Sequence, residues 1–118
     1  MALSLATKTR MLRSVFDGGA FLVGLLAGDD EIGPVGYERQ PVRFEVTYDK
    51  ATSIDEARWG AFPADVVESV SGFVVYDTKG VEVARESLQG VSFGQGDRRP
   101  SLARPSFDAG DLSVTLEG

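Results

Sequence analysis

The most regular hydrophobic pattern in the chain is a two-residue alternation over positions 42–49. Its apolar and aromatic members are Val42, Phe44, Val46 and Tyr48, and charged or hydroxyl-bearing side chains stand between them. Because successive side chains of a strand point to opposite faces, this alternation predicts a strand with one buried face. Pro41 suits the entry to such a strand or an edge position.

A helical periodicity near the start of the sequence predicts a helix from Leu5 to Phe16. Its apolar face consists of Leu5, Leu12, Val15 and Phe16, with Met11 beside them, and the basic residues Lys8, Arg10 and Arg13 lie on the other side. Ser4 is a suitable N-cap residue, and Gly18–Gly19 provides a suitable stop. Since a helix this short is marginal alone, its apolar stripe must pack on the domain or on a neighbouring subunit.

The other elements are predicted to be short strands joined by turns. The segment Ala20–Ala27 is apolar on both faces and predicts a strand buried on both sides, with a loop from Asp29 to Gly36 after it. Further strand regions are predicted at Trp59–Phe62 before Pro63, at Val66–Tyr76 with a bulge or close-packed site at Gly72, at Val81–Leu88, at Val91–Phe93 and at Leu112–Leu116. Asp77–Gly80 predicts a hairpin turn, and Gly94–Arg104 predicts a long loop.

These elements predict a mainly β fold, an antiparallel β-sandwich or small barrel with one short N-terminal α-helix. The chain has 118 residues, the size of one domain. We divide it into an N-terminal helical arm over residues 1–17 and a β domain over residues 20–117. Deleting residues 2–16 is expected to leave a folded β domain that no longer assembles.

Composition argues against most enzymatic chemistry. The chain contains no cysteine and no histidine, so it lacks the usual nucleophile, general base and metal ligands. We therefore expect a non-enzymatic protein without a cofactor or bound metal. The net charge of −6 disfavours binding to nucleic-acid phosphates. The longest apolar run, Ala20–Ala27, is too short to span a membrane, and Thr7–Arg10 interrupts any signal-peptide core, so we expect a protein made in the cytoplasm.

Five segments invite a ligand or partner hypothesis, and a structural role is favoured for most of them. The acidic run Asp29–Glu31 lacks the spacing of a calcium loop and is expected to lie in a solvated loop. Asp108 and Asp111 are expected to hydrogen-bond the turn before the last strand. Gly94–Asp97 lacks the lysine of a phosphate-binding loop. Tyr37, Arg39 and Gln40 precede the alternating strand and are expected to have a structural role, in which Arg39 and Gln40 satisfy backbone carbonyls of a neighbouring loop. Arg98, Arg99 and Arg104 suit contact with an acidic partner surface, or else form part of a solvated loop.

The order of several weak motifs resembles a family of small tailed-bacteriophage virion proteins, often labelled tail fibre or minor tail proteins. The matching segments are the helix Leu3–Phe16, Gly36–Phe44, Phe62–Pro63, Val70–Asp77 and Ala109–Thr115. Two features depart from the family pattern. Val67–Ser69 stands where a tryptophan–glycine pair is usual, here found earlier as Trp59–Gly60, and the segment Arg98–Pro105 is an insertion.

The resemblance implies a virion structural protein that contacts other virion proteins, and we expect a homo-oligomer. The minor tail position is favoured over capsid decoration on the head surface. The predicted contact residues are Leu5, Leu12, Val15 and Phe16 of the helix and Arg98, Arg99 and Arg104 of the loop. A carbohydrate- or ligand-binding β-sandwich is the alternative class, with Tyr37, Tyr48 and Trp59 as its candidate aromatics. A carboxylate-dependent hydrolase rests only on the number of acidic residues.

Overall fold

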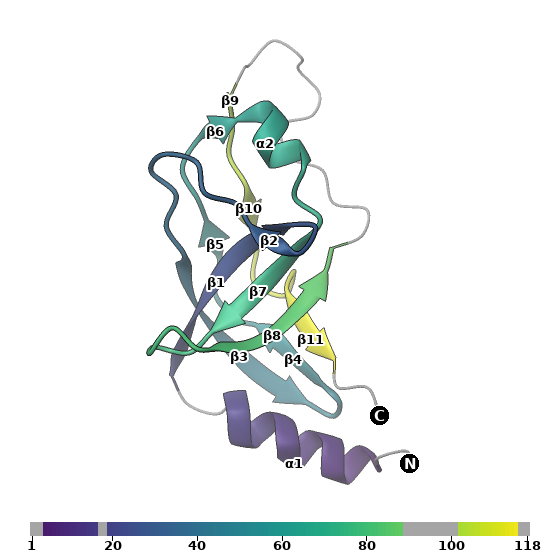
Figure 1. Cartoon of the computed structure of the whole chain (residues 1–118). Coiled ribbons are helices and arrows are strands. Elements are labelled where there is room, and N and C mark those ends of the chain that lie inside the picture. The colour runs from purple at the N-terminus through teal and green to yellow at the C-terminus, as the bar shows by residue number, and fades with distance from the viewer. Residues whose placement is uncertain (1–3, 17–18, 89–101, 116–118) are drawn as a thin grey trace.

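An antiparallel sheet that curls into a half-barrel is the centre of the fold (Figure 1). The computed structural model describes residues 4–16, 19–88 and 102–115. The strands of this sheet are β1 (Ala20–Ala27), β2 (Asp30–Glu31), β3 (Gln40–Thr47), β4 (Lys50–Ser53), β7 (Gly72–Tyr76), β8 (Glu82–Ser87) and β11 (Ser113–Thr115). Their order is β11–β4–β3–β1–β7–β8, and β2 pairs with β1. The predicted fold class, mainly β with an N-terminal helix, is confirmed.

Two smaller strand pairs and two helices complete the described part of the chain. The pairs are β5 (Ala57–Arg58) with β10 (Ser106–Phe107), and β6 (Phe62–Pro63) with β9 (Leu102–Ala103). The helices are α1 (Leu5–Phe16) and α2 (Ala64–Glu68). Figure 1 shows α1 at one end of the curled sheet, and α2, β6 and β9 at the opposite end. None of the described helices is long and apolar enough to cross a membrane.

The central strands β1 and β7 are buried on both faces, as predicted for Ala20–Ala27. On the inner face, Val23, Leu25 and Val75 have no or almost no exposed surface and belong to the main core. On the outer face, Leu26 and Val74 are also buried. A strand can be apolar on both sides only where both faces are covered, and here the covering groups on the outer face include polar side chains described below.

The helix α1 closes one end of the half-barrel. The Ser4 hydroxyl accepts a hydrogen bond from the Thr7 amide at 3.2 Å, which confirms the predicted N-cap. Leu12 is 5% exposed and Phe16 is 2% exposed, and both belong to the core. The Phe16 ring lies 5.1 Å from that of Phe21 and 5.2 Å from that of Phe44. The helix is therefore part of the domain, and its two most buried residues are not available to a second chain while it is packed.

Several predicted elements differ from the structure. Residues 66–70 do not form a strand, because α2 begins after Pro63 and occupies Ala64–Glu68. Pro63 suits a helix start, and the Asp65 carboxylate accepts a hydrogen bond from the Val66 amide in the first turn. The β-branched Val66 and Val67 favoured a strand in the sequence, but these local signals for a helix outweigh that preference. The loop predicted over 29–36 contains β2, and the loop predicted over 94–104 ends in β9. The strand predicted at 91–93 lies outside the described residues.

Gly72 is a close-packed site, one of the two roles predicted for it, and its substitution provides a test of the sheet. A Cβ atom at this position would lie 2.6 Å from the backbone oxygen of Glu86 in the neighbouring strand. We expect Gly72→Ala to lower the free energy of unfolding by about 1–3 kcal/mol, because backbone must shift to admit the methyl group. Urea unfolding followed by the fluorescence of Trp59, which is buried, measures the change.

The matched control for Gly72→Ala is Gly60→Ala. No atom lies within 4 Å of a Cβ built on Gly60, and its φ is not in the left-handed region. This variant should be as stable as the wild type or slightly more stable. Equal unfolding midpoints for the two variants would contradict the close-packing role of Gly72.

Candidate functional site

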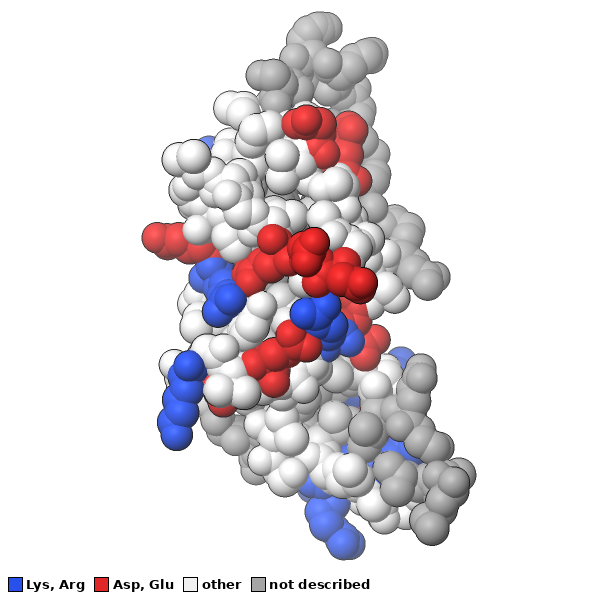
Figure 2. All heavy atoms as spheres, in the orientation of Figure 1, with Lys and Arg blue, Asp and Glu red and all other residues white. Residues whose placement is uncertain are grey.

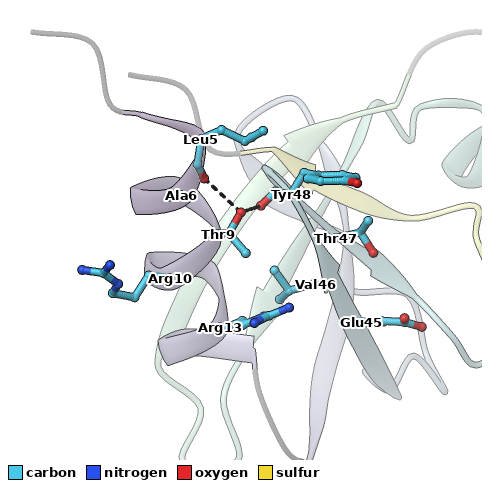
Figure 3. Close-up of a pocket in the computed structure, with 9 residues that line it drawn as sticks. All are labelled: Leu5, Ala6, Thr9, Arg10, Arg13, Glu45, Val46, Thr47 and Tyr48. Carbon is cyan, nitrogen blue, oxygen red and sulfur yellow. Dashed lines mark hydrogen bonds between the residues drawn. The ribbon is translucent and has the colours of Figure 1, made fainter.

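A groove beside α1 is the main concave surface near the predicted contact helix (Figure 3). It encloses about 820 Å³ between the helix and the hairpin that joins β3 to β4. Its lining residues are Leu5, Ala6, Thr9, Arg10 and Arg13 from α1, and Glu45, Val46, Thr47 and Tyr48 from β3 and its turn. Figure 3 shows Arg13 extending toward the hairpin and Arg10 extending away from it. The groove thus combines apolar walls with basic side chains at its rim.

The hairpin side of the groove has an unusual backbone conformation at Tyr48. Thr47 pairs with Lys50, so Tyr48 and Asp49 form a two-residue turn. Tyr48 has a φ of 57°, in the left-handed region where glycine is preferred. The Thr9 hydroxyl lies 2.5 Å from the Tyr48 carbonyl oxygen and 2.9 Å from that of Leu5, so α1 helps to hold this turn. Tyr48 was predicted to continue the buried face of the strand, but it is 66% exposed in the turn.

The charge of α1 is opposite to that of the chain. The helix contains Lys8, Arg10 and Arg13 and no acidic residue, whereas the whole chain has a net charge of −6. Four other arginines form ion pairs with acidic side chains, namely Arg39, Arg43, Arg58 and Arg85. Arg10 and Arg13 are exposed and form no ion pair with a described residue. Their charges are therefore available to a partner.

A second hollow of about 370 Å³ lies on the other flank of α1, at the seam between the edge strands β8 and β11. Met11 and Val15 of the helix line it together with Val83 of β8 and Val114 of β11. Met11 is 44% exposed and Val15 is 45% exposed. Each of the two strands is paired on one side only within the described part of the sheet. This flank is the apolar part of the helix surface.

The richest polar cluster lies elsewhere, on the outer face of β1, and it is internally saturated. The Glu31 carboxylate accepts hydrogen bonds from the Tyr37 hydroxyl at 2.6 Å, the Tyr76 hydroxyl at 2.9 Å, and Arg39 at 2.9 and 3.0 Å. The Arg39 guanidinium also lies 3.5 Å from the centre of the Tyr76 ring. With four donors on one carboxylate, the cluster has little capacity left for a ligand.

This cluster supplies a hydrogen bond where the backbone pairing along one edge of β1 is interrupted. Pairing of β3 with β1 extends from Ala20 to Val23, and pairing of β2 begins at Leu26, which leaves Gly24 and Leu25 between them. The Leu25 amide donates to the Tyr37 hydroxyl at 2.9 Å, and the Leu25 carbonyl accepts the Ile32 amide at 3.0 Å. Gly24 admits the cluster, because a Cβ there would lie 2.3 Å from a Glu31 oxygen. The cluster is thus a structural element of the sheet.

The electrostatics of the cluster agree with this role. Burial raises the pKa of Glu31, but hydrogen bonds from Arg39, Tyr37 and Tyr76 outweigh it and leave the pKa below its ordinary value of 4.5. Burial and the hydrogen bond to Glu31 raise the pKa of Tyr37 above its ordinary value of 10.0. At neutral pH the network therefore holds a charged carboxylate and neutral tyrosines.

The structure separates the residues predicted to make protein contacts. Leu5 is 50% exposed and Val15 is exposed, whereas Leu12 and Phe16 are core residues. Arg104 is exposed just after β9, at the end of the molecule opposite α1. Arg98 and Arg99 lie outside the described residues. Sequence reasoning did not select Arg10 and Arg13 as contact residues, although the absence of acidic residues from the helix was a visible signal for them. For function, it named Tyr48 only as a candidate aromatic for carbohydrate binding.

Other predicted roles have mixed outcomes. The predicted structural role of Tyr37 and Arg39 is confirmed, but their partner is the Glu31 carboxylate and not backbone carbonyls. Gln40 donates to a backbone carbonyl, that of Glu38. Glu31 was predicted to lie in a solvated loop, which is wrong because it joins this cluster.

The predicted turn role of Asp111 is confirmed, since its carboxylate accepts a hydrogen bond from the Asp108 amide at 2.8 Å. Among the described residues, no group of three or more acidic side chains is arranged to hold a metal ion.

Comparison of the chain with protein-family models, with curated proteins and with solved structures gave no match. The aromatic residues suggested for carbohydrate binding are mostly occupied within the domain. Trp59 is 3% exposed and lies 5.9 Å from the Phe107 ring, and Tyr37 belongs to the Glu31 cluster. Only Tyr48 of the three presents its ring to solvent. Function must therefore be argued from the surface around α1.

Proposed function

We propose that this protein is a bacteriophage virion structural protein of the minor tail type, which acts through protein–protein contacts in the assembled particle. The observation that carries the proposal is the surface of α1. The helix is anchored by Leu12 and Phe16, yet it leaves Met11 and Val15 exposed beside open strand edges and Arg10 and Arg13 without ion-pair partners among the described residues. An exposed apolar flank next to uncompensated charge is typical of a surface that binds another protein.

The fold is compatible with such a role. Edge strands with unpaired backbone groups are sites at which neighbouring chains add strands, and here both edges of the half-barrel meet beside α1. The resemblance of the segments Gly36–Phe44 and Ala109–Thr115 to small phage virion proteins supports the same function. Capsid decoration on the head is the alternative within this class, and the same surface would serve it.

Immunoelectron microscopy tests the proposal. Antibody raised against the purified chain would be applied to tailed phage particles from cells that encode it, both intact and dissociated. We expect label on the tail. Label confined to the head would replace the tail assignment with capsid decoration, and absence of label from intact, dissociated and tailless particles would overturn the virion role.

A further inference from the structure

Two of the charged surfaces that form no ion pair among the described residues lie on separate parts of the molecule. One is the basic rim of the α1 groove, formed by Arg10 and Arg13. The other is the turn between β1 and β2, where Asp29 and Asp30 are adjacent and exposed. Neither carboxylate forms an ion pair within 4 Å of a described cationic group. The Arg85 guanidinium lies beside this turn, where it donates to the Asp29 backbone oxygen at 2.9 Å while its ion pair is with Glu82. Each surface therefore keeps charged side chains that form no ion pair with a described residue.

The position of these surfaces prevents them from meeting within one molecule. Figure 1 shows α1 across one end of the curled sheet, while β2 lies beyond the middle of β1. Figure 2 shows acidic side chains gathered across the middle of this face with basic side chains between them, and the ion pairs of Glu31 with Arg39 and of Glu82 with Arg85 involve β2 and β8. Charge is thus unevenly distributed over the molecule, with a net charge of +3 on the helix α1 at one end and an acidic band on the sheet. Contact between the two requires a second copy.

The two surfaces carry opposite charge. Arg10 and Arg13 are three residues apart on the helix, and Arg13 extends toward the hairpin, where Glu45 also lines the groove, whereas Arg10 extends to the outer side (Figure 3). Asp29 follows Gly28, which has a φ of 66°, in the two-residue turn, and Asp30 is the first residue of β2. Guanidinium groups bind carboxylates through paired hydrogen bonds, and the α1 groove, of about 820 Å³, places Arg13 beside an open hollow. Exposed Leu5 and Tyr48 beside the arginines supply apolar contact area.

We propose that the α1 groove of one copy binds the acidic β1–β2 turn of a second copy, so that the chain self-associates through unlike surfaces. This inference rests on the proposed function and names its partner as the same chain. A contact between unlike surfaces produces a ring when the rotation between copies closes and an open filament when it does not, and two copies that exchange the contact with each other form a pair. Because the contact is largely charged and partly exposed, it weakens with increasing salt concentration.

Complementary charge reversal tests the contact. Sedimentation velocity of the wild type between about 1 and 500 µM, at low salt, should show association that 0.5 M NaCl reverses. Arg10→Glu with Arg13→Glu should weaken association by about 10- to 100-fold, and Asp29→Lys with Asp30→Lys should do the same. An equimolar mixture of the two double variants should associate again, because each retains the surface that the other has inverted. Circular dichroism confirms that each variant is folded.

A control variant separates this contact from a general charge effect. Arg58→Glu with Lys79→Glu changes the net charge by the same amount as the α1 variant, and both residues are exposed and lie outside the groove. It should associate like the wild type. A second acidic variant, Asp65→Lys with Glu68→Lys on α2, should also leave association unchanged.

Three results would overturn the inference. The first is a wild type that stays monomeric throughout the concentration range, and the second is association that neither double charge reversal affects. The third is restored association when the Arg10→Glu, Arg13→Glu variant is mixed with the Asp65→Lys, Glu68→Lys variant and not with the Asp29→Lys, Asp30→Lys variant. These failures are distinct from failure of the virion role. A monomeric chain that labels the phage tail would remove only the self-association, whereas an associating chain absent from particles would remove only the virion assignment.

Discussion

We expect Phe16→Ala to lower the free energy of unfolding by about 3–5 kcal/mol, the largest effect predicted for any single residue considered. The ring is 2% exposed and contacts two others, at 5.1 Å to Phe21 and 5.2 Å to Phe44. Truncation leaves a cavity where α1 meets β1 and β3, and the helix cannot refill it because its neighbouring side chains point elsewhere. Urea unfolding, followed by far-ultraviolet circular dichroism, measures the loss.

Val15→Ala is the matched control for Phe16→Ala. It shortens the adjacent helix residue, which is 45% exposed, and should change the unfolding free energy by no more than about 0.5 kcal/mol. Similar effects of the two variants would show that α1 does not pack as described. The packing also revises the expected outcome of deleting residues 2–16. Removal of Leu12 and Phe16 opens the core, so the truncated chain should be less stable as well as unable to assemble.

The second large effect is expected at Glu31. Glu31→Ala should lower the free energy of unfolding by about 2–4 kcal/mol at pH 7, because two tyrosine hydroxyls and Arg39 lose their shared acceptor. The Glu31 and Arg39 side chains are 18% and 35% exposed, so water compensates part of the loss. The control Glu38→Ala removes an exposed carboxylate nearby and should have little effect.

The pH dependence of stability distinguishes the charge of Glu31 from its size. Its pKa in the folded chain lies below the ordinary value of 4.5, so its ionised form stabilises the fold. This contribution is fully present above about pH 4.5 and is lost as the pH falls through the pKa of the folded state. Glu31→Gln keeps the shape and removes the titration. Between pH 6 and 3 the wild type should therefore lose more stability than the glutamine variant, and parallel curves would contradict the network.

The local elements of the fold were predictable because short-range rules govern them. The alternation through Val42 and Phe44 predicted β3, the helical periodicity after Ser4 predicted α1 with its cap, and Asp77–Gly80 predicted the β7–β8 turn, where the Gly80 amide donates to the Asp77 carbonyl at 3.0 Å. Each signal is set by residues within a few positions of one another. Where a second local rule competed, as at Pro63 before two valines, pattern reading predicted a strand in place of α2.

The candidate site was only partly predictable, since it depends on which face of each element is covered. One apolar stripe of the predicted helix contains Leu5, Leu12, Val15 and Phe16. Packing of α1 against the sheet nevertheless buries Leu12 and Phe16 and leaves Leu5 and Val15 exposed. Glu31 and Tyr76 are distant in the sequence, and they meet because β2 and β7 both pair with β1. No local pattern contains that information.

The sequence by itself determined the class of fold, the N-terminal helix with its excess of basic residues, and the absence of histidine and cysteine. These properties depend on composition and on the period of apolar residues. Only the tertiary structure decided that α1 closes the half-barrel, that Glu31 joins Tyr37, Arg39 and Tyr76, and that Arg10 and Arg13 border an open groove. Those outcomes depend on curling of the sheet, which brings together residues that are far apart along the chain.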